Sequence, residues 1–153
     1  MVKRVVRVML MVVMAGISLA PTSAQAASQG TGAVLVGRVS NGTSYDITAV
    51  RFNTSVDHTD CTVWNGVNGG PARSEYTFTT CQRYNIGAGT ISGTLLDLDG
   101  FRPALSYPPS YYMVRFGSGA WRVIDWYHYT RITDSEYVGC KNGSVYMECT
   151  IYG

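Results

Sequence analysis

Residues 110–125 read SYYMVRFGSGAWRVID, with two β-prone runs on either side of Gly117-Ser118-Gly119. Tyr, Val, Phe, Trp and Ile favour extended backbone, and a short glycine-rich break between two such runs is typical of a β-hairpin. The pattern predicts one strand over 110–116 and a second over 120–132. This stretch therefore indicates antiparallel β-structure.

The same pattern recurs along the chain from residue 32 to the end. Short runs rich in Val, Ile, Thr, Tyr and Phe alternate with Gly, Asn and Asp-Gly breaks. Asn41-Gly42, between runs 32–40 and 43–53, is predicted as a hairpin turn, because type I′ turns need positive φ at both central residues. The other predicted strands are 59–65, 74–84, 89–97, 136–139 and 144–152. We expect an all-β fold, a small antiparallel β-sandwich or barrel of about 7–9 short strands.

Four cysteines strengthen this interpretation: Cys61, Cys81, Cys140 and Cys149. An even number in an exported protein indicates two disulfides, and the short C-x-x-C spacings of a zinc site are absent. Segments that are neighbours in sequence tend to be neighbours in a sheet, which favours pairing 61 with 81 and 140 with 149.

The second of these bridges conflicts with a tight turn at Asn142-Gly143. With a two-residue turn, Cys140 lies opposite Val145 and cannot reach Cys149. Either the loop is wider and Cys140–Cys149 closes it, or the pairing is crossed, with Cys61 joined to Cys140.

Residues 1–26 are predicted to be a signal peptide. They combine a basic start at residues 3–7, an apolar run over 8–20 and the small-residue site Ala24-Gln25-Ala26. The apolar run is shorter than the roughly 20 residues of a membrane-spanning helix. We therefore expect residues 27–153 to form a single secreted β-domain, with no membrane insertion after cleavage.

Charge and acidic motifs limit the partners and cofactors. Beyond residue 26 the chain has nine Lys and Arg against ten Asp and Glu, and the basic residues are scattered singly. Nucleic-acid binding needs a dense basic face, so nucleic acid is not an expected partner. Asp97-Leu98-Asp99-Gly100 resembles the start of an EF-hand loop, but Pro108 stands at the twelfth position, where a glutamate is required. No metal and no cofactor is predicted.

Catalytic motifs are incomplete. Gly117-Ser118-Gly119 lacks the strand-to-helix context of a nucleophile elbow, and His58 and His128 lack a basic phosphate site. Asp125 is the best single acid for glycoside hydrolysis, which needs a second carboxyl group nearby. These residues favour a non-enzymatic function.

Aromatic side chains are concentrated between residues 107 and 129. Strict alternation over 120–132 places one set towards the core: Trp121, Val123, Tyr127 and Tyr129. The other set then needs a second layer or a partner to cover it: Arg122, Ile124, Trp126 and His128. Tyr, Trp and Arg are enriched at binding hot spots. The predicted binding residues are Tyr111, Tyr112, Arg122, Trp126 and His128.

Together these features predict a secreted, non-enzymatic binding protein. We expect an adaptor or accessory subunit of an extracellular complex, whose partner is another secreted or cell-surface protein, with a glycan as a further partner. It would bind by edge-strand addition or through an aromatic patch with an arginine at its rim. Two alternatives stay open: a protease inhibitor that presents loop 102–109, and a lectin-like module with Trp126 or Tyr111 on its surface.

Overall fold

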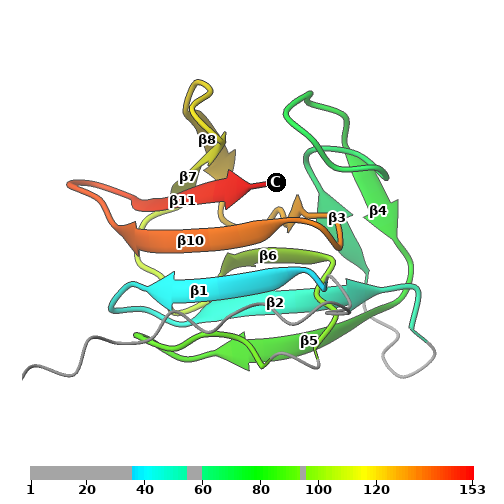
Figure 1. Cartoon of the computed structure of the whole chain (residues 1–153), viewed down its shortest axis with the longest axis horizontal. Helices are drawn as coiled ribbons and strands as arrows, with labels where there is room; N and C mark the ends of the chain where they lie inside the picture. The colour runs from blue at the N-terminus through cyan, green and yellow to red at the C-terminus, as the bar shows by residue number, and fades with distance from the viewer. Residues whose placement is uncertain (1–35, 55–59, 94–95) are drawn as a thin grey trace, which may run out of the picture. The chain divides into compact units, whose positions relative to one another are not determined.

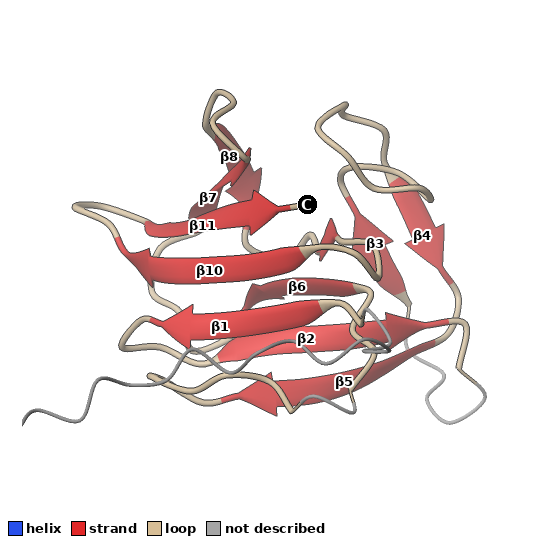
Figure 2. Cartoon of the chain, in the orientation of Figure 1, coloured by secondary structure: helices blue, strands red, loops and turns tan. Residues whose placement is uncertain are grey.

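A computed structural model describes residues 36–54, 60–93 and 96–153; the predicted signal peptide, residues 1–26, lies outside this part of the chain. The described residues form eleven strands and no helix (Figure 2). The largest sheet has five strands, in the order β1 (Arg38–Gly42), β10 (Tyr137–Asn142), β11 (Met147–Tyr152), β7 (Tyr111–Phe116) and β8 (Arg122–Asp125).

A four-stranded sheet packs against the first one. Its order is β5 (Cys81–Ile86), β2 (Ile47–Phe52), β6 (Gly100–Pro103) and β9 (Thr130–Arg131). The two sheets share one apolar core, to which the larger contributes Val114, Val138 and Ile151 and the smaller Ala49 and Phe101. The all-β, sandwich-like fold predicted from the sequence is confirmed.

A two-stranded sheet, β3 (Cys61–Val63) and β4 (Tyr76–Phe78), covers the other face of the four-stranded sheet. Successive residues of a strand point to opposite faces. Ala49 of β2 therefore reaches the main core, whereas Phe52 reaches a second cluster and stacks on Phe78 with ring centroids 4.0 Å apart.

Both disulfides form with the sequential pairing. Cys140 lies directly opposite Cys149, and the pair Asn142 and Met147 closes a four-residue loop, so the wider of the two predicted loops is the correct one. Cys61 lies opposite Phe78 rather than Cys81, so its bridge joins β3 to β5 instead of spanning a simple hairpin. Two disulfides indicate an oxidising environment.

The predicted hairpin at Asn41-Gly42 is wrong. These residues belong to β1, which pairs in parallel with β10 (Figure 1), and β11 is likewise parallel to β7. The sheet is therefore mixed rather than purely antiparallel, and the eleven strands exceed the predicted 7–9. Asn41 is buried rather than exposed at a turn, and its Nδ2 donates to the carbonyl oxygens of Tyr45, Ile86 and Gly87 at 2.8, 2.9 and 3.1 Å.

The strand predicted over 89–97 is absent from the described residues of that segment, which form turns and a single bridge between Ile91 and Ser40. Loop 102–109, expected in the protease-inhibitor alternative, instead begins inside the buried strand β6. Gly100 permits this, because a Cβ there would lie 3.0 Å from the Phe52 ring and from the Thr130 carbonyl oxygen. Pro103 is the last residue of β6. On the β9 side only Gly100 and Phe101 are paired, so the missing N–H of Pro103 removes no hydrogen bond from the sheet.

The hairpin of β7 and β8 around Gly117-Ser118-Gly119 is confirmed, but its second strand is shorter than predicted. β8 ends at Asp125, whose carbonyl oxygen accepts from the His128 N–H at 3.0 Å, and the chain resumes as β9 in the other sheet. Strict alternation over 120–132 therefore fails. Ile124 faces the core, whereas Val123 and Tyr127, predicted to be internal, are exposed.

Candidate functional site

The side of the five-stranded sheet that faces away from the core carries an unusual set of side chains. We call it the outer sheet face: Tyr111, Met113, Arg115, Trp121, Val123, Tyr137 and Tyr152. Four of them expose large apolar groups: Tyr111 (43%), Val123 (51%), Tyr137 (39%) and Tyr152 (51%). Neither core cluster of the described residues includes any of the seven.

Ring contacts and one arginine organise the outer sheet face. Tyr137 and Tyr152 are cross-strand partners with stacked rings 5.9 Å apart. The Arg115 guanidinium lies 4.6 Å from the centre of the Trp121 ring, and its Nε donates to the Thr150 hydroxyl at 3.0 Å. Rings and an arginine held in this way lose little freedom when a partner binds.

The predicted binding residues do not form one surface. Tyr111 is exposed, and its ring contacts that of Tyr146 at 6.5 Å. Tyr112, in contrast, has no accessible surface, so its prediction as a binding residue is wrong. Arg122 is the first residue of β8 and is half-buried, with its Nη1 donating to the Ala120 carbonyl oxygen at 3.1 Å.

Tyr112 instead belongs to a buried chain of hydrogen bonds. Its hydroxyl donates to the His128 carbonyl oxygen at 3.0 Å, so it must accept from the Thr130 hydroxyl, 2.7 Å away. Thr130 in turn accepts from the Trp64 indole N–H at 2.8 Å. Burial raises the pKa of Tyr112 far above its usual range, so the phenol remains a neutral donor. This is a structural network.

His128 is buried beside two carboxylates. Its Nε2 lies 3.2 Å from Glu75 Oε2, and its Nδ1 lies 3.7 Å from Asp125 Oδ2. Among the described residues, no hydroxyl or thiol hydrogen-bonds to the imidazole ring. The other candidate histidine, His58, lies outside the described residues.

Trp126 is half-buried over Arg102, whose guanidinium lies 5.7 Å from the Trp126 ring and 4.8 Å from the Tyr129 ring. Arg102 is itself buried in β6, and Tyr107 is buried further along. The segment 102–109 is therefore not one exposed loop, which corrects the prediction on which the protease-inhibitor alternative rested. Only part of the segment is exposed, including Leu105 at 70% and Pro108.

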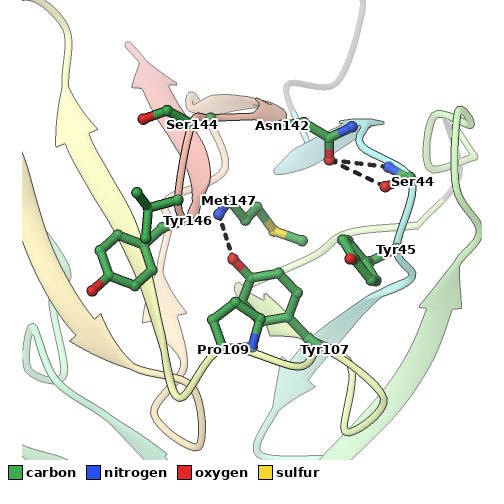
Figure 3. Close-up of a pocket in the computed structure, with 10 residues that line it drawn as sticks. Ser44, Tyr45, Tyr107, Pro109, Asn142, Ser144, Tyr146 and Met147 are labelled. Carbon is green, nitrogen blue, oxygen red and sulfur yellow. Dashed lines mark hydrogen bonds between the residues drawn. The ribbon is translucent and has the colours of Figure 1, made fainter.

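A pocket of about 250 Å³ opens at the end of the sandwich where three loops meet (Figure 3). We call it the loop pocket: Ser44, Tyr45, Tyr107, Pro109, Asn142, Gly143, Ser144, Val145, Tyr146 and Met147. This site is not predicted from the sequence, because its residues come from three segments that lie far apart along the chain. The available signal was an aromatic residue close to each turn or loop: Tyr45 and Tyr146 lie at the starts of the predicted strands that follow Asn41-Gly42 and Asn142-Gly143, and Tyr107 lies in the expected loop 102–109.

Tyr107 forms the centre of the loop pocket. Its hydroxyl accepts from the backbone N–H of Met147, and the Tyr45 ring meets it edge-on at 5.2 Å. Burial raises the pKa of Tyr107, so the phenol is neutral at physiological pH. Across the rim, Asn142 Oδ1 accepts from the backbone N–H of Ser44 at 3.2 Å (Figure 3).

No protein-family model matches the chain, and it matches no curated protein and no solved structure. Within the described residues, no group of three or more His, Cys, Asp or Glu side chains is placed to hold a metal ion. The described part of the chain also contains no helix of the length and apolarity needed to cross a membrane.

Proposed function

We propose that the chain is a secreted, non-enzymatic binding protein, an adaptor or accessory subunit whose outer sheet face docks onto another secreted or cell-surface protein. The observation that carries this proposal is the exposure of four large apolar side chains on one sheet face. The signal-like residues 1–26 and the oxidising environment indicated by the two disulfides agree with secretion.

The composition of the outer sheet face supports a protein partner. Protein interfaces are enriched in Tyr, Trp, Met and Arg, all of which occur here, and are depleted in Lys and Glu. Lys141 and Glu148 lie on the same side of the sheet as these residues, and they neutralise each other through an ion pair of 3.3 Å. Arg115, half-buried against Trp121, is the polar anchor among these exposed rings.

The size of this face also matters. Five strands spaced about 4.8 Å apart, with about six residues each, cover roughly 400 Å² in projection. A stable interface buries about 800 Å² per partner, so the face supplies a large part of one and adjoining segments would supply the rest.

The edge strand β8 is one such segment. The Trp126 N–H donates to the Ser110 carbonyl oxygen at 3.0 Å. This bond identifies the positions of β8 that are hydrogen-bonded to β7, which are every second residue counted back from Trp126. Bonding alternates along an antiparallel pair, so the N–H and C=O of Val123 point away from the sheet. A partner strand that pairs there would lie beside the outer sheet face.

The proposal is tested by recovering the tagged protein from culture supernatant and identifying stoichiometric companions by mass spectrometry. The double variant Arg115→Ala/Tyr152→Ser removes the anchor and one ring from the outer sheet face and should lose the companion. Ile91→Ser, which changes an exposed apolar residue outside that face, should retain it. Equal recovery by both variants, or a lone monomer that turns over a substrate, would contradict the proposal.

A further inference from the structure

We infer that the loop pocket is a binding site for a neutral carbohydrate residue. The site is separate from the outer sheet face, and the inference does not depend on the protein-docking proposal. It rests on the three rings of the pocket, its free hydrogen-bonding groups, its lack of charge and its rigidity.

Three tyrosines supply the apolar surfaces. Tyr45 and Tyr146 lie on opposite sides of Tyr107 (Figure 3), and Pro109 lies beside Tyr107. The face of an aromatic ring carries negative potential, which attracts the weakly positive C–H groups on one face of a sugar ring. A pocket built from phenol rings therefore suits a ligand that is apolar on its faces and polar at its edge.

Polar groups at the rim suit the edge of such a ligand. Asn142 uses its Oδ1 to accept from the backbone N–H and the hydroxyl of Ser44, at 3.2 and 3.4 Å. Among the described residues, neither the Asn142 Nδ2 nor the Ser144 hydroxyl has a hydrogen-bond partner. The amide offers two donors, and the hydroxyl can donate and accept. Sugar hydroxyl groups need this mixture.

No charge lines the loop pocket. None of its ten lining residues is an Asp, Glu, Lys, Arg or His, and burial raises the pKa of Tyr107, which keeps that phenol protonated. Lys141 and Glu148 flank the loop but are paired with each other. An acidic or basic ligand would lose hydration without gaining an opposite charge, so a neutral ligand is favoured.

The pocket is built before any ligand arrives. Met147 N–H holds the Tyr107 hydroxyl, and the Cys140–Cys149 disulfide closes the hairpin whose loop forms one wall. A volume of about 250 Å³ is just below the usual range of about 300–1,000 Å³ for small-molecule sites. It suits one sugar residue, either free or at the end of a chain. For so small a ligand we expect a Kd on the order of 1 mM.

The test uses NMR on the disulfide-bonded, secreted protein. Methyl glycosides of glucose, galactose, mannose and N-acetylglucosamine are titrated separately to about 50 mM, well above the expected Kd. At least one should shift the amide signals of Gly143, Ser144 and Tyr45 in a saturable manner. Methyl glucuronide, which is anionic, should bind more weakly than the best neutral sugar.

Variants locate the binding. Tyr45→Ala removes one ring and should raise the Kd at least tenfold, whereas Tyr45→Phe keeps the ring and should change it less than twofold. Asn142→Ala provides an independent loss of binding should Tyr45→Ala fail to fold. Tyr152→Ala, on the outer sheet face, is the control and should leave the Kd unchanged. The inference is overturned if no neutral glycoside shifts these signals, if Tyr45→Ala and Asn142→Ala both leave binding intact, or if the glucuronide binds best.

Discussion

Replacing Thr130 with valine tests the buried hydrogen-bond chain that holds the aromatic segment in place. Thr130 is fully buried, and its hydroxyl accepts from the Trp64 indole N–H and donates to the Tyr112 hydroxyl. The Tyr112 hydroxyl in turn donates a hydrogen bond to the His128 carbonyl oxygen. Valine has nearly the same shape as threonine, so the substitution removes the hydroxyl and leaves the packing in place.

The expected cost follows from which groups lose a partner. The Trp64 N–H is buried and would have no acceptor, which costs about 1–3 kcal/mol. The Tyr112 oxygen loses an incoming donor but keeps the bond that it donates, which costs about 1 kcal/mol. The free energy of unfolding should therefore fall by about 2–4 kcal/mol, a large share of the 5–15 kcal/mol typical of a domain. The Tm should fall by roughly 8–15 °C.

Urea unfolding, followed by tryptophan fluorescence with the disulfides intact, measures this loss. Thr79→Val is the matched control, because Thr79 is exposed and has no hydrogen bond among the described residues; it should change stability by less than about 0.5 kcal/mol. A double-mutant cycle with Tyr112→Phe should show coupling, because the two hydroxyls share a bond. A loss from Thr130→Val below about 0.5 kcal/mol, or strict additivity in the cycle, would refute the chain of donors described above.

Three further predictions concern stability. Removing the Cys61–Cys81 disulfide should lower the free energy of unfolding by about 3.3 kcal/mol, and removing Cys140–Cys149 should lower it by about 2.6 kcal/mol. The first disulfide has the larger effect because it closes the longer loop, with a sequence separation of 20 against 9. Urea unfolding of the two paired cysteine-to-alanine variants measures both losses. Burial raises the pKa of Asp99 above its usual 3.8, so its charged form opposes folding at neutral pH and opposes it less as the pH falls through the folded-state pKa. Asp99→Asn should therefore be more stable than the native protein at pH 7, with an advantage that shrinks towards pH 4 in parallel urea titrations. Gly100→Ala should lower the free energy of unfolding by about 1–3 kcal/mol and so lower the Tm, because the added Cβ would meet two groups at 3.0 Å. Gly93→Ala is the control and should leave the Tm unchanged, because the nearest neighbour of its Cβ lies at 3.9 Å.

Local features of the fold were predictable from the sequence, because their causes lie within a few residues. The hairpin over 110–125 follows from two β-prone runs and a glycine-rich break, and β7 and β8 form there. The sequential disulfides follow from cysteine number and proximity along the chain. The face of each strand was harder to predict. Ile124 and Val123 are both apolar, so alternation alone did not identify which of them enters the core.

The same limit explains the mixed outcome for the predicted binding residues. Tyr111 and Tyr112 are adjacent and identical in type, yet one is exposed and the other is completely buried. Their difference depends on the register of β7 against β11, which pairs Val114 with Cys149 in the core. That register is a long-range property. A cluster of aromatic residues in the sequence therefore indicates a surface or a core without distinguishing them.

The missed loop pocket and the missed parallel pairing have one cause. Parallel strands end at the same edge of a sheet, so the parallel pair of β1 and β10 brings the loop after β1 beside the loop after β10. Ser44 and Asn142, 98 residues apart in sequence, consequently share a hydrogen bond across the rim of the pocket. An antiparallel arrangement would have placed these two loops at opposite ends of the sheet. The buried Asn41 side chain, near this end of β1, donates to the carbonyl oxygens of Tyr45, Ile86 and Gly87, so it ties the loop that carries Tyr45 to the end of β5 and helps to position one wall of the pocket.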